Sequence, residues 1–238
     1  MTRIWRLAIA VWLVGAMAAH AQDRPRRFTI WDIRLGEAAS AIPDEYVNLA
    51  CGTNGGPPSI PLAGFADFHK CKPEAGGLRE VYFEYDDELE YEARALDNAP
   101  EIRMYAGTTV FDFPVIASLL FDDAGRVVGE RMVTDPRQHL SRDRIEFWEL
   151  ANFLRQRFGE EGWTCEDIPA EEGEGPVGSR FLKNRCAKTA SGVMMIVEQR
   201  LFQRKGQQFV DPESGRSQPQ AFESATRFEI REVGAPPR

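Results

Sequence analysis

The four cysteines are the residues of this chain whose type and spacing are best suited to chemistry. Cysteine thiols can act as nucleophiles, bind metal or form disulfides, and a redox site favours a Cys-x-x-Cys spacing that the sequence lacks. Cys51 and Cys71 are separated by almost the same number of residues as Cys165 and Cys186. Among the three possible pairings, this spacing favours Cys51 with Cys71 and Cys165 with Cys186, as structural disulfides formed in an oxidising compartment.

The segment that begins at Cys51 is the second candidate, and its sequence is CGTNGGPPS. Its glycines permit positive φ angles and close backbone approach, so its amides can form a nest that holds an anion. No phosphate-loop lysine follows, and a plain irregular turn is the competing interpretation. As a presented loop, the segment could equally contact a protein. The candidate binding residues are Gly52, Thr53, Asn54, Gly55 and Gly56.

Histidine offers little for acid–base catalysis or for zinc. Beyond the first 21 residues the chain holds only His69 and His139, and it has no Gly-x-Ser-x-Gly or His-Glu-x-x-His pattern. His69 lies close to Cys71, and His139 precedes Ser141, an expected helix cap, so both fit surface or packing roles. We therefore expect no catalytic residue, no metal site and no cofactor, and we favour a protein that is not an enzyme.

An acidic run follows the first expected strand and comprises Asp86, Asp87, Glu88, Glu90 and Glu92. Carboxylate oxygens are the ligands that calcium prefers, but the run lacks the Asp-x-Asp-x-Asp-Gly spacing that surrounds one ion. We interpret it as solvated charge at the end of a strand, where it discourages pairing between sheet edges.

The first 21 residues have the three regions of a secretory signal peptide. Arg3 and Arg6 flank a basic start, residues 7–19 are almost wholly apolar, and an A-x-A cleavage site ends at Ala21. The apolar run is shorter than the roughly 20 residues that a spanning helix needs. We expect cleavage after Ala21 and a soluble periplasmic or secreted protein without an integral membrane segment.

The acidic composition opposes binding to nucleic acid. The chain holds 37 Asp and Glu residues against 29 Lys and Arg, a formal net charge of −8. Phosphate backbones repel such a chain, and no basic stripe reverses the repulsion locally. Export, the lack of catalytic patterns and rigid units rich in loops favour another protein of the cell envelope as the partner.

Hydrophobic periodicity and turn residues predict the elements that position these groups. A helix with one apolar face is expected around residues 147–158, with Gly159 as its stop. A shorter helix is expected over 37–42, and a further turn from Asp44 to Leu49. Asp122 to Gly125 suit a hairpin turn. Strand patterns occupy 77–85, 115–121, 126–134, 179–183, 193–202 and 224–233, and irregular segments are expected at 96–108, 160–178 and 205–220.

These elements predict an α+β fold of two tandem units, each a short helical segment packed on a meandering antiparallel sheet and stapled by a disulfide. The units span 22–138 and 139–233, after the signal peptide at 1–21 and before a flexible tail at 234–238. The sequences that start at the second cysteine of each pair, CKPEAGGLREV and CAKTASGVMMI, share alanine, glycine and aliphatic positions, which favours a duplication. Chance similarity between two loops of similar size is the competing explanation.

This layout of tandem repeats, each with its own disulfide, resembles the β-lactamase inhibitor proteins and, as a single unit, small outer-membrane assembly lipoproteins. The resemblance covers most of the chain after the signal peptide. It implies a binding or assembly role instead of catalysis. The alternative is an enzyme or small-molecule binder with a pocket between the units and Asp86, Asp87 or Asp135 at its rim.

Overall fold

The computed structural model describes residues 28–85, 88–105, 107–136, 143–206, 208–210, 217–219 and 222–234. The expected signal peptide, residues 235–238 of the expected tail, and the candidates Asp86, Asp87, His139 and Ser141 lie outside these residues. All four cysteines and the whole loop after Cys51 lie within them.

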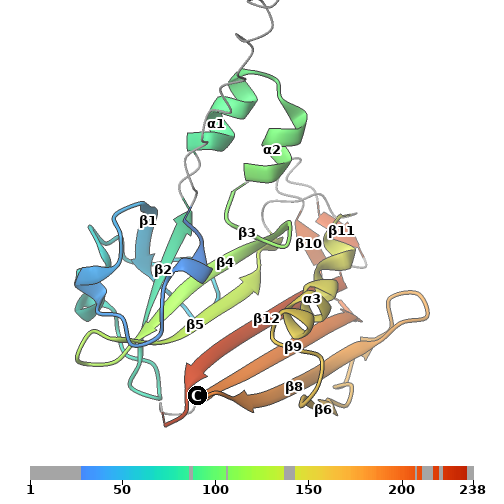
Figure 1. Ribbon diagram of the computed structural model, residues 1–238. Helices are drawn as coiled ribbons and strands as arrows, with labels where there is room; N and C mark the ends of the chain where they lie inside the picture. Colours follow the sequence, from blue (N-terminus) through green and yellow to red (C-terminus); the bar gives the residue numbers. More distant parts are fainter. Residues whose placement is uncertain are drawn as a thin grey trace, which may run out of the picture.

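Antiparallel strands dominate the described residues, and most of them belong to one ten-stranded sheet (Figure 1). Its main path is formed by β1 (Tyr46–Cys51), β2 (Arg79–Tyr85), β4 (Phe113–Phe121), β5 (Val127–Thr134), β12 (Phe222–Glu232), β9 (Val193–Arg204), β8 (Leu182–Ala190) and β6 (Thr164–Asp167), in that order. Four short strands lie off this path, with β3 (Thr109–Val110) on β4, β7 (Glu174–Gly175) on β9, and β10 (Gln208–Val210) paired with β11 (Ser217–Pro219).

Two four-stranded meanders meet in the middle of this sheet. The strands β1, β2, β4 and β5 follow one another in chain order from one edge, and β6, β8, β9 and β12 do so from the other edge. The meanders join where β5 pairs with β12, from Gly129 opposite Arg231 to Val133 opposite Arg227. The last strand of the described residues, β12, therefore lies at the centre of the sheet.

Short helices complete the fold, which is mostly antiparallel sheet and broadly fits the α+β class. They are the 3-10 helices η1 (Ile30–Asp32), η2 (Ala39–Ala41), η3 (Phe65–Lys70) and η5 (Asp143–Glu149), and the α-helices α1 (Glu88–Ala95), α2 (Ala99–Tyr105) and α3 (Leu150–Arg157). Helices α1 and α2 form a hairpin that stands beyond the sheet at the top of Figure 1. Among the described residues, the helices are too short or too polar to cross a membrane.

The face of the sheet that α3, η1 and η3 cover, which we call the inner face, carries the main hydrophobic core. Phe83 of β2 is fully buried there, and its ring lies edge-on to those of Tyr46 and Phe65, at centroid distances of 5.1 and 5.6 Å. Phe158, at the end of α3, stacks on Phe228 of β12 at 5.2 Å. Each such side chain contributes about 2 kcal/mol by leaving water, and together they hold the helices on the sheet.

Several elements confirm the predictions from periodicity. Strand β2 begins two residues later than expected, and β4 and β5 form the expected hairpin. The amide of Gly125 donates to the carbonyl of Asp122 at 3.0 Å, and Gly125 has a φ of +76°, as its tight turn requires. Helix α3 buries Leu150 and Leu154 at the predicted spacing and ends before Gly159, which has a φ of +85°.

The prediction for residues 37–49 is wrong in two respects. The expected helix over 37–42 is reduced to the three residues of η2, and the turn from Asp44 to Leu49 is replaced by β1, which begins at Tyr46. The reason is tertiary, because Tyr46 is buried against Phe65 and Phe83. An extended strand beside β2 places this ring in the core, and a helical turn does not.

The prediction of an irregular segment at 96–108 is also wrong, because most of these residues belong to the hairpin of α1 and α2. The acidic run follows β2, which ends at Tyr85, and its part from Glu88 onwards belongs to α1. Glutamate and alanine favour helix, and Arg94 forms an ion pair with Glu90 one turn earlier at 2.6 Å. The expected strand 179–183 begins only at Leu182 and continues to Ala190, and the loop expected at 160–178 contains β6 and β7.

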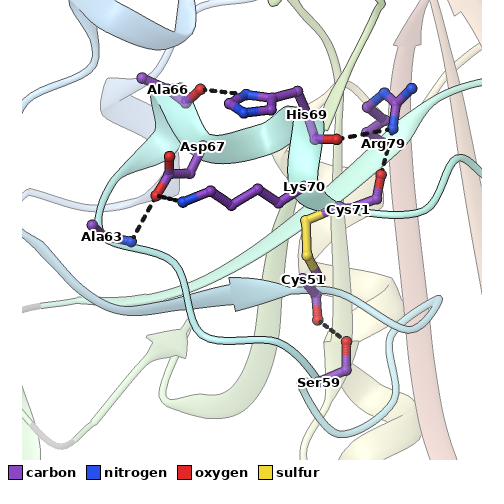
Figure 2. Close-up of a disulfide and its surroundings, with 9 residues drawn as sticks. All are labelled: Cys51, Ser59, Ala63, Ala66, Asp67, His69, Lys70, Cys71 and Arg79. Carbon is purple, nitrogen blue, oxygen red and sulfur yellow. Dashed lines mark hydrogen bonds and ion pairs between the residues drawn. A yellow bond between two sulfur atoms is a disulfide. The ribbon is translucent and has the colours of Figure 1, made fainter.

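Two disulfides join the cysteines in the pairing that their spacing predicts, Cys51 with Cys71 and Cys165 with Cys186. Figure 2 shows the first, which links the end of β1 to the residue after η3. Arg79 donates to the carbonyl of Cys71 at 2.5 Å, and the Ser59 hydroxyl donates to that of Cys51 at 3.0 Å. The disulfide is thus fastened on both sides to β2 and to the glycine-rich loop.

Candidate functional site

The face of the sheet opposite α3, which we call the charged face, holds the candidate site. Side chains alternate between the two faces of a strand. The residues between the core positions of β2, β5 and β12 therefore point away from the helices. They include Glu80, Arg131, Arg227, Glu229 and Arg231, which are all buried or nearly so.

The glycine-rich loop lies on this face and forms the amide nest that its sequence allows. The amide of Asn54 donates to Oε2 of Glu80 in a short hydrogen bond, and the amide of Gly55 donates to Oε1 at 3.2 Å. The amide of Gly52 donates to the main-chain carbonyl of Glu80 at 2.9 Å. The anion that occupies the nest is therefore a carboxylate of this chain.

At two positions of the loop the backbone lies so close to the sheet that only glycine fits. A Cβ atom at Gly52 would overlap the side chain of Glu80. Gly55 has a φ of +80°, and a Cβ there would overlap Cγ2 of Val133 on β5. The loop therefore rests directly on the sheet. The Thr53 hydroxyl, which donates to the carbonyl of Pro57 at 2.7 Å, closes it on itself.

Arg131 is the centre of the charges beneath the loop, and its side chain is fully buried. Its guanidinium contacts Glu74 at 2.6 and 3.1 Å, Glu80 at 2.9 Å and Glu229 at 2.8 Å. Burial alone lowers the pKa of Arg131. The hydrogen bonds to Glu74 and the charges of Glu80 and Glu229 outweigh burial and hold that pKa above its usual range.

Glu229 gathers two further arginines on β12. Arg227 donates to its Oε2 at 3.3 Å, and Arg231 forms a close ion pair with its Oε1. Arg227 also binds Asn54, so the loop is tied to both meanders. Three guanidinium groups and three carboxylates thus form one connected network of balanced charge, which makes the charged face rigid next to the loop.

A hollow of about 320 Å³ opens beside this network. Its lining comes from three adjacent strands: Arg185 on β8, Met194, Ile196 and Glu198 on β9, and Arg227, Glu229 and Arg231 on β12. In the sheet register Glu198 lies between Arg185 and Arg227, Ile196 lies opposite Glu229, and Met194 lies opposite Arg231. The hollow therefore combines an apolar part on β9 with guanidinium groups on both flanking strands.

Arg185 differs from the other arginines of the hollow. Among the described residues its guanidinium has no hydrogen-bond or ion-pair partner within 4 Å, although Glu198 lies opposite it in the sheet. The carboxylate of Glu198 is instead 3.4 Å from Arg200 on its own strand. Arg185 therefore offers a charged group to a ligand, whereas Arg227 and Arg231 are engaged by Glu229.

Other sequence candidates lie elsewhere. His69 is on η3, where Nδ1 lies 3.2 Å from the carbonyl of Ala66, and Asp135 is buried beyond the end of β5, outside the lining of the hollow. Within the described ranges no three His, Cys, Asp or Glu side chains gather as metal ligands. The charged network was not predicted from the sequence. Its one signal was the alternation of Arg227, Glu229 and Arg231 within an expected strand, where inward and outward residues alternate.

Comparisons with family models, with curated proteins and with solved structures find no match to this chain. The chemistry of the site is therefore inferred from the residues that form it. These residues can hold an anion beside an apolar surface. Among the described residues of the hollow there is no serine, cysteine or histidine to serve as a nucleophile or a general base.

Proposed function

We propose that this chain is an exported periplasmic binding or accessory protein without catalytic activity, and that its charged face recognises another envelope protein. One observation carries the proposal: the glycine-rich loop and the hollow lie on the same face, joined by Arg227, which binds Asn54 and lines the hollow. Binding residues often lie on loops that a rigid scaffold positions, as the sheet and the disulfide do for this loop.

Export is supported by the signal-peptide pattern of residues 1–21, with cleavage after Ala21. It is also supported by the two disulfides, because such bonds persist in oxidising compartments and are rare in the cytosol. A binding protein of the periplasm also gains from these cross-links, since each restricts the unfolded chain and stabilises the fold by about 3 kcal/mol.

The two-unit plan is part of the proposal. The order of strands supports it, since each half of the chain contributes one four-stranded meander to the sheet. The disulfides support it as well, because each links the first strand of a meander to the segment or strand that follows. A duplicated unit of this kind fits the resemblance to β-lactamase inhibitor proteins, in which tandem units serve binding.

Small-molecule binding is the second candidate function, and the volume of the hollow favours it. About 320 Å³ lies at the lower end of the range of ligand pockets. The hollow does not lie between the two meanders, however, because all its lining residues come from β8, β9 and β12 of the second. The charged network and the glycine-rich loop border the hollow. This arrangement favours a protein partner that covers both the hollow and the loop.

Photo-crosslinking in cells of the source organism tests the proposal. A photoreactive residue is placed at Pro57 on the loop or at Thr189, an exposed position of β8 next to Met194. The matched control is Phe153, which is 42% exposed on α3 over the opposite face. We expect one envelope protein to crosslink from Pro57 and Thr189 and not from Phe153. Crosslinks from Phe153 alone, or from none of the three positions, contradict the proposal.

A further inference from the structure

The lining of the hollow has one more positive charge than negative charges. Its lining holds the three guanidinium groups of Arg185, Arg227 and Arg231 against the two carboxylates of Glu198 and Glu229. Glu229 already contacts Arg227, Arg231 and the buried Arg131, so its oxygens are committed to that network. The excess positive charge therefore lies at Arg185.

Arg185 is held in a position that suits a bound carboxylate. It lies on the central part of β8 and is paired with Glu198 in the sheet register, so its backbone is fixed. A guanidinium presents a planar set of N–H donors that matches a carboxylate with two parallel hydrogen bonds. With no partner among the described residues, Arg185 has these donors available.

An apolar surface adjoins this charge. Met194 and Ile196 occupy alternate positions of β9, point to the same face as Arg185, and are only partly buried. The walls are already ordered by ion pairs, so a ligand need not organise them when it binds. A ligand that places an apolar group on β9 and a carboxylate on Arg185 would satisfy both parts of the hollow.

We propose that the hollow binds an acidic side chain of the partner protein together with a neighbouring apolar side chain, and that Arg185 is the residue that binds the carboxylate. This inference rests on the proposed function, because it names the chemistry of the segment that the charged face recognises. Arg227 and Arg231 line the same hollow, and both contact Glu229.

A pair of peptides that differ only in charge tests the inference directly. The probe is Ac-Gly-Phe-Glu-Gly-NH2, and its uncharged match is Ac-Gly-Phe-Gln-Gly-NH2. Binding to the disulfide-bonded protein is followed by two-dimensional amide NMR. We expect saturable shifts of β8, β9 and β12 signals with the glutamate peptide, and at least tenfold weaker binding of the glutamine peptide. Equal affinity of the two peptides, or shifts elsewhere on the fold, overturns the inference.

Two variants separate the role of Arg185 from a general charge effect. R185Q removes the charge at the hollow, and R126Q removes a charge from the hairpin turn, where Arg126 pairs with Asp122. We expect R185Q to weaken binding of the glutamate peptide at least tenfold, to leave the glutamine peptide unchanged, and to retain the amide spectrum of the folded protein. The R126Q protein is expected to bind like the unmodified chain, and a loss of binding in R126Q equal to that in R185Q overturns the inference.

Photo-crosslinking from Pro57 in the R185Q chain distinguishes this inference from the proposed function. Loss of the crosslinked partner in R185Q supports the inference. A partner that crosslinks equally well to both chains leaves the proposed function in place and overturns the role of Arg185. If the glutamate peptide binds in the hollow but no partner crosslinks to the unmodified chain, the proposed function fails and the carboxylate chemistry of the hollow stands.

Discussion

The guanidinium of Arg227 donates hydrogen bonds to both oxygens of Asn54, at 2.8 Å to the main-chain oxygen and 2.6 Å to the side-chain oxygen. The two residues are 173 positions apart in the chain. Because Arg227 also contacts Glu229 and lines the hollow, the loop and the hollow share one fixed side chain. A substitution in the loop should therefore alter the hollow, and a substitution in the hollow should alter the loop.

Replacing Arg227 by methionine tests this coupling. The aliphatic stem is kept, but Asn54 loses its two hydrogen bonds and Glu229 loses one of its cations. We expect the free energy of unfolding to fall by about 1–3 kcal/mol, and the amides of Asn54 and Gly55 to exchange with solvent faster. Urea unfolding and hydrogen exchange measure the two effects. The control is Arg126→Met, which should leave exchange in the loop unchanged; faster loop exchange in both variants would refute the coupling.

Gly55 is expected to tolerate alanine poorly for two separable reasons. Its φ of +80° disfavours any side chain, and the added Cβ would overlap Val133. Gly77 has nearly the same φ, +81°, but open space around it, so Gly77→Ala isolates the backbone effect. We expect Gly77→Ala to cost about 1 kcal/mol and Gly55→Ala about 1–3 kcal/mol more, measured by urea unfolding. Equal losses would show that the loop moves away from β5 without penalty.

Removing the central cation of the network should cost more than removing any single carboxylate. Arg131→Met leaves Glu74, Glu80 and Glu229 close together, and two of them stay nearly buried. We expect a loss of about 3–5 kcal/mol in the free energy of unfolding. The double variant Arg131→Met/Glu80→Gln should recover part of this loss, because it removes one uncompensated charge. A double variant less stable than Arg131→Met would contradict this account.

The sequence predicted those parts of the fold that depend on local pattern. The hairpin around Asp122 to Gly125 combines period-two strands with a turn that needs a positive φ, and both are visible in the residues. The prediction of a helical turn from Asp44 to Leu49 was wrong, because the conformation of this segment depends on contacts of Tyr46 in the core. Its partners there, Phe65 and Phe83, come from later in the chain. Local propensity does not contain that information.

The candidate site shows the same division. The glycines after Cys51 predicted a nest of amides, but not its anion, since Glu80 lies 26 positions after Asn54. The hollow depends on the register of three strands, which places Arg185, Glu198 and Arg227 in one row. Register is set by packing across the whole sheet, so the hollow could not be derived from the order of residues alone.

Glu130 on β5 gives the stability of the protein an unusual dependence on pH. Its side chain points to the inner face, where its register neighbours are Leu119 and Ile230. Burial raises the pKa of Glu130 to about 8, and the charge of Arg157 at the end of α3 lowers it only in part. The folded protein therefore holds a proton on Glu130 at a pH where the unfolded chain has released it.

The sign of the effect follows from this difference in proton binding. With a pKa of about 8 when folded and 4.5 in the open chain, Glu130 is protonated in both states below pH 4.5 and does not oppose folding there. As the pH rises towards 8, the unfolded chain releases this proton and the folded protein keeps it, so the free energy of unfolding falls by up to about 1.4 kcal/mol per pH unit. The variant Glu130→Gln keeps the shape of the side chain and cannot ionise. We expect the two proteins to be about equally stable near pH 4.5 and the variant to be more stable by a few kcal/mol at pH 8, measured by urea unfolding. A difference between them that stays constant over this range would show that folding does not raise the pKa of Glu130.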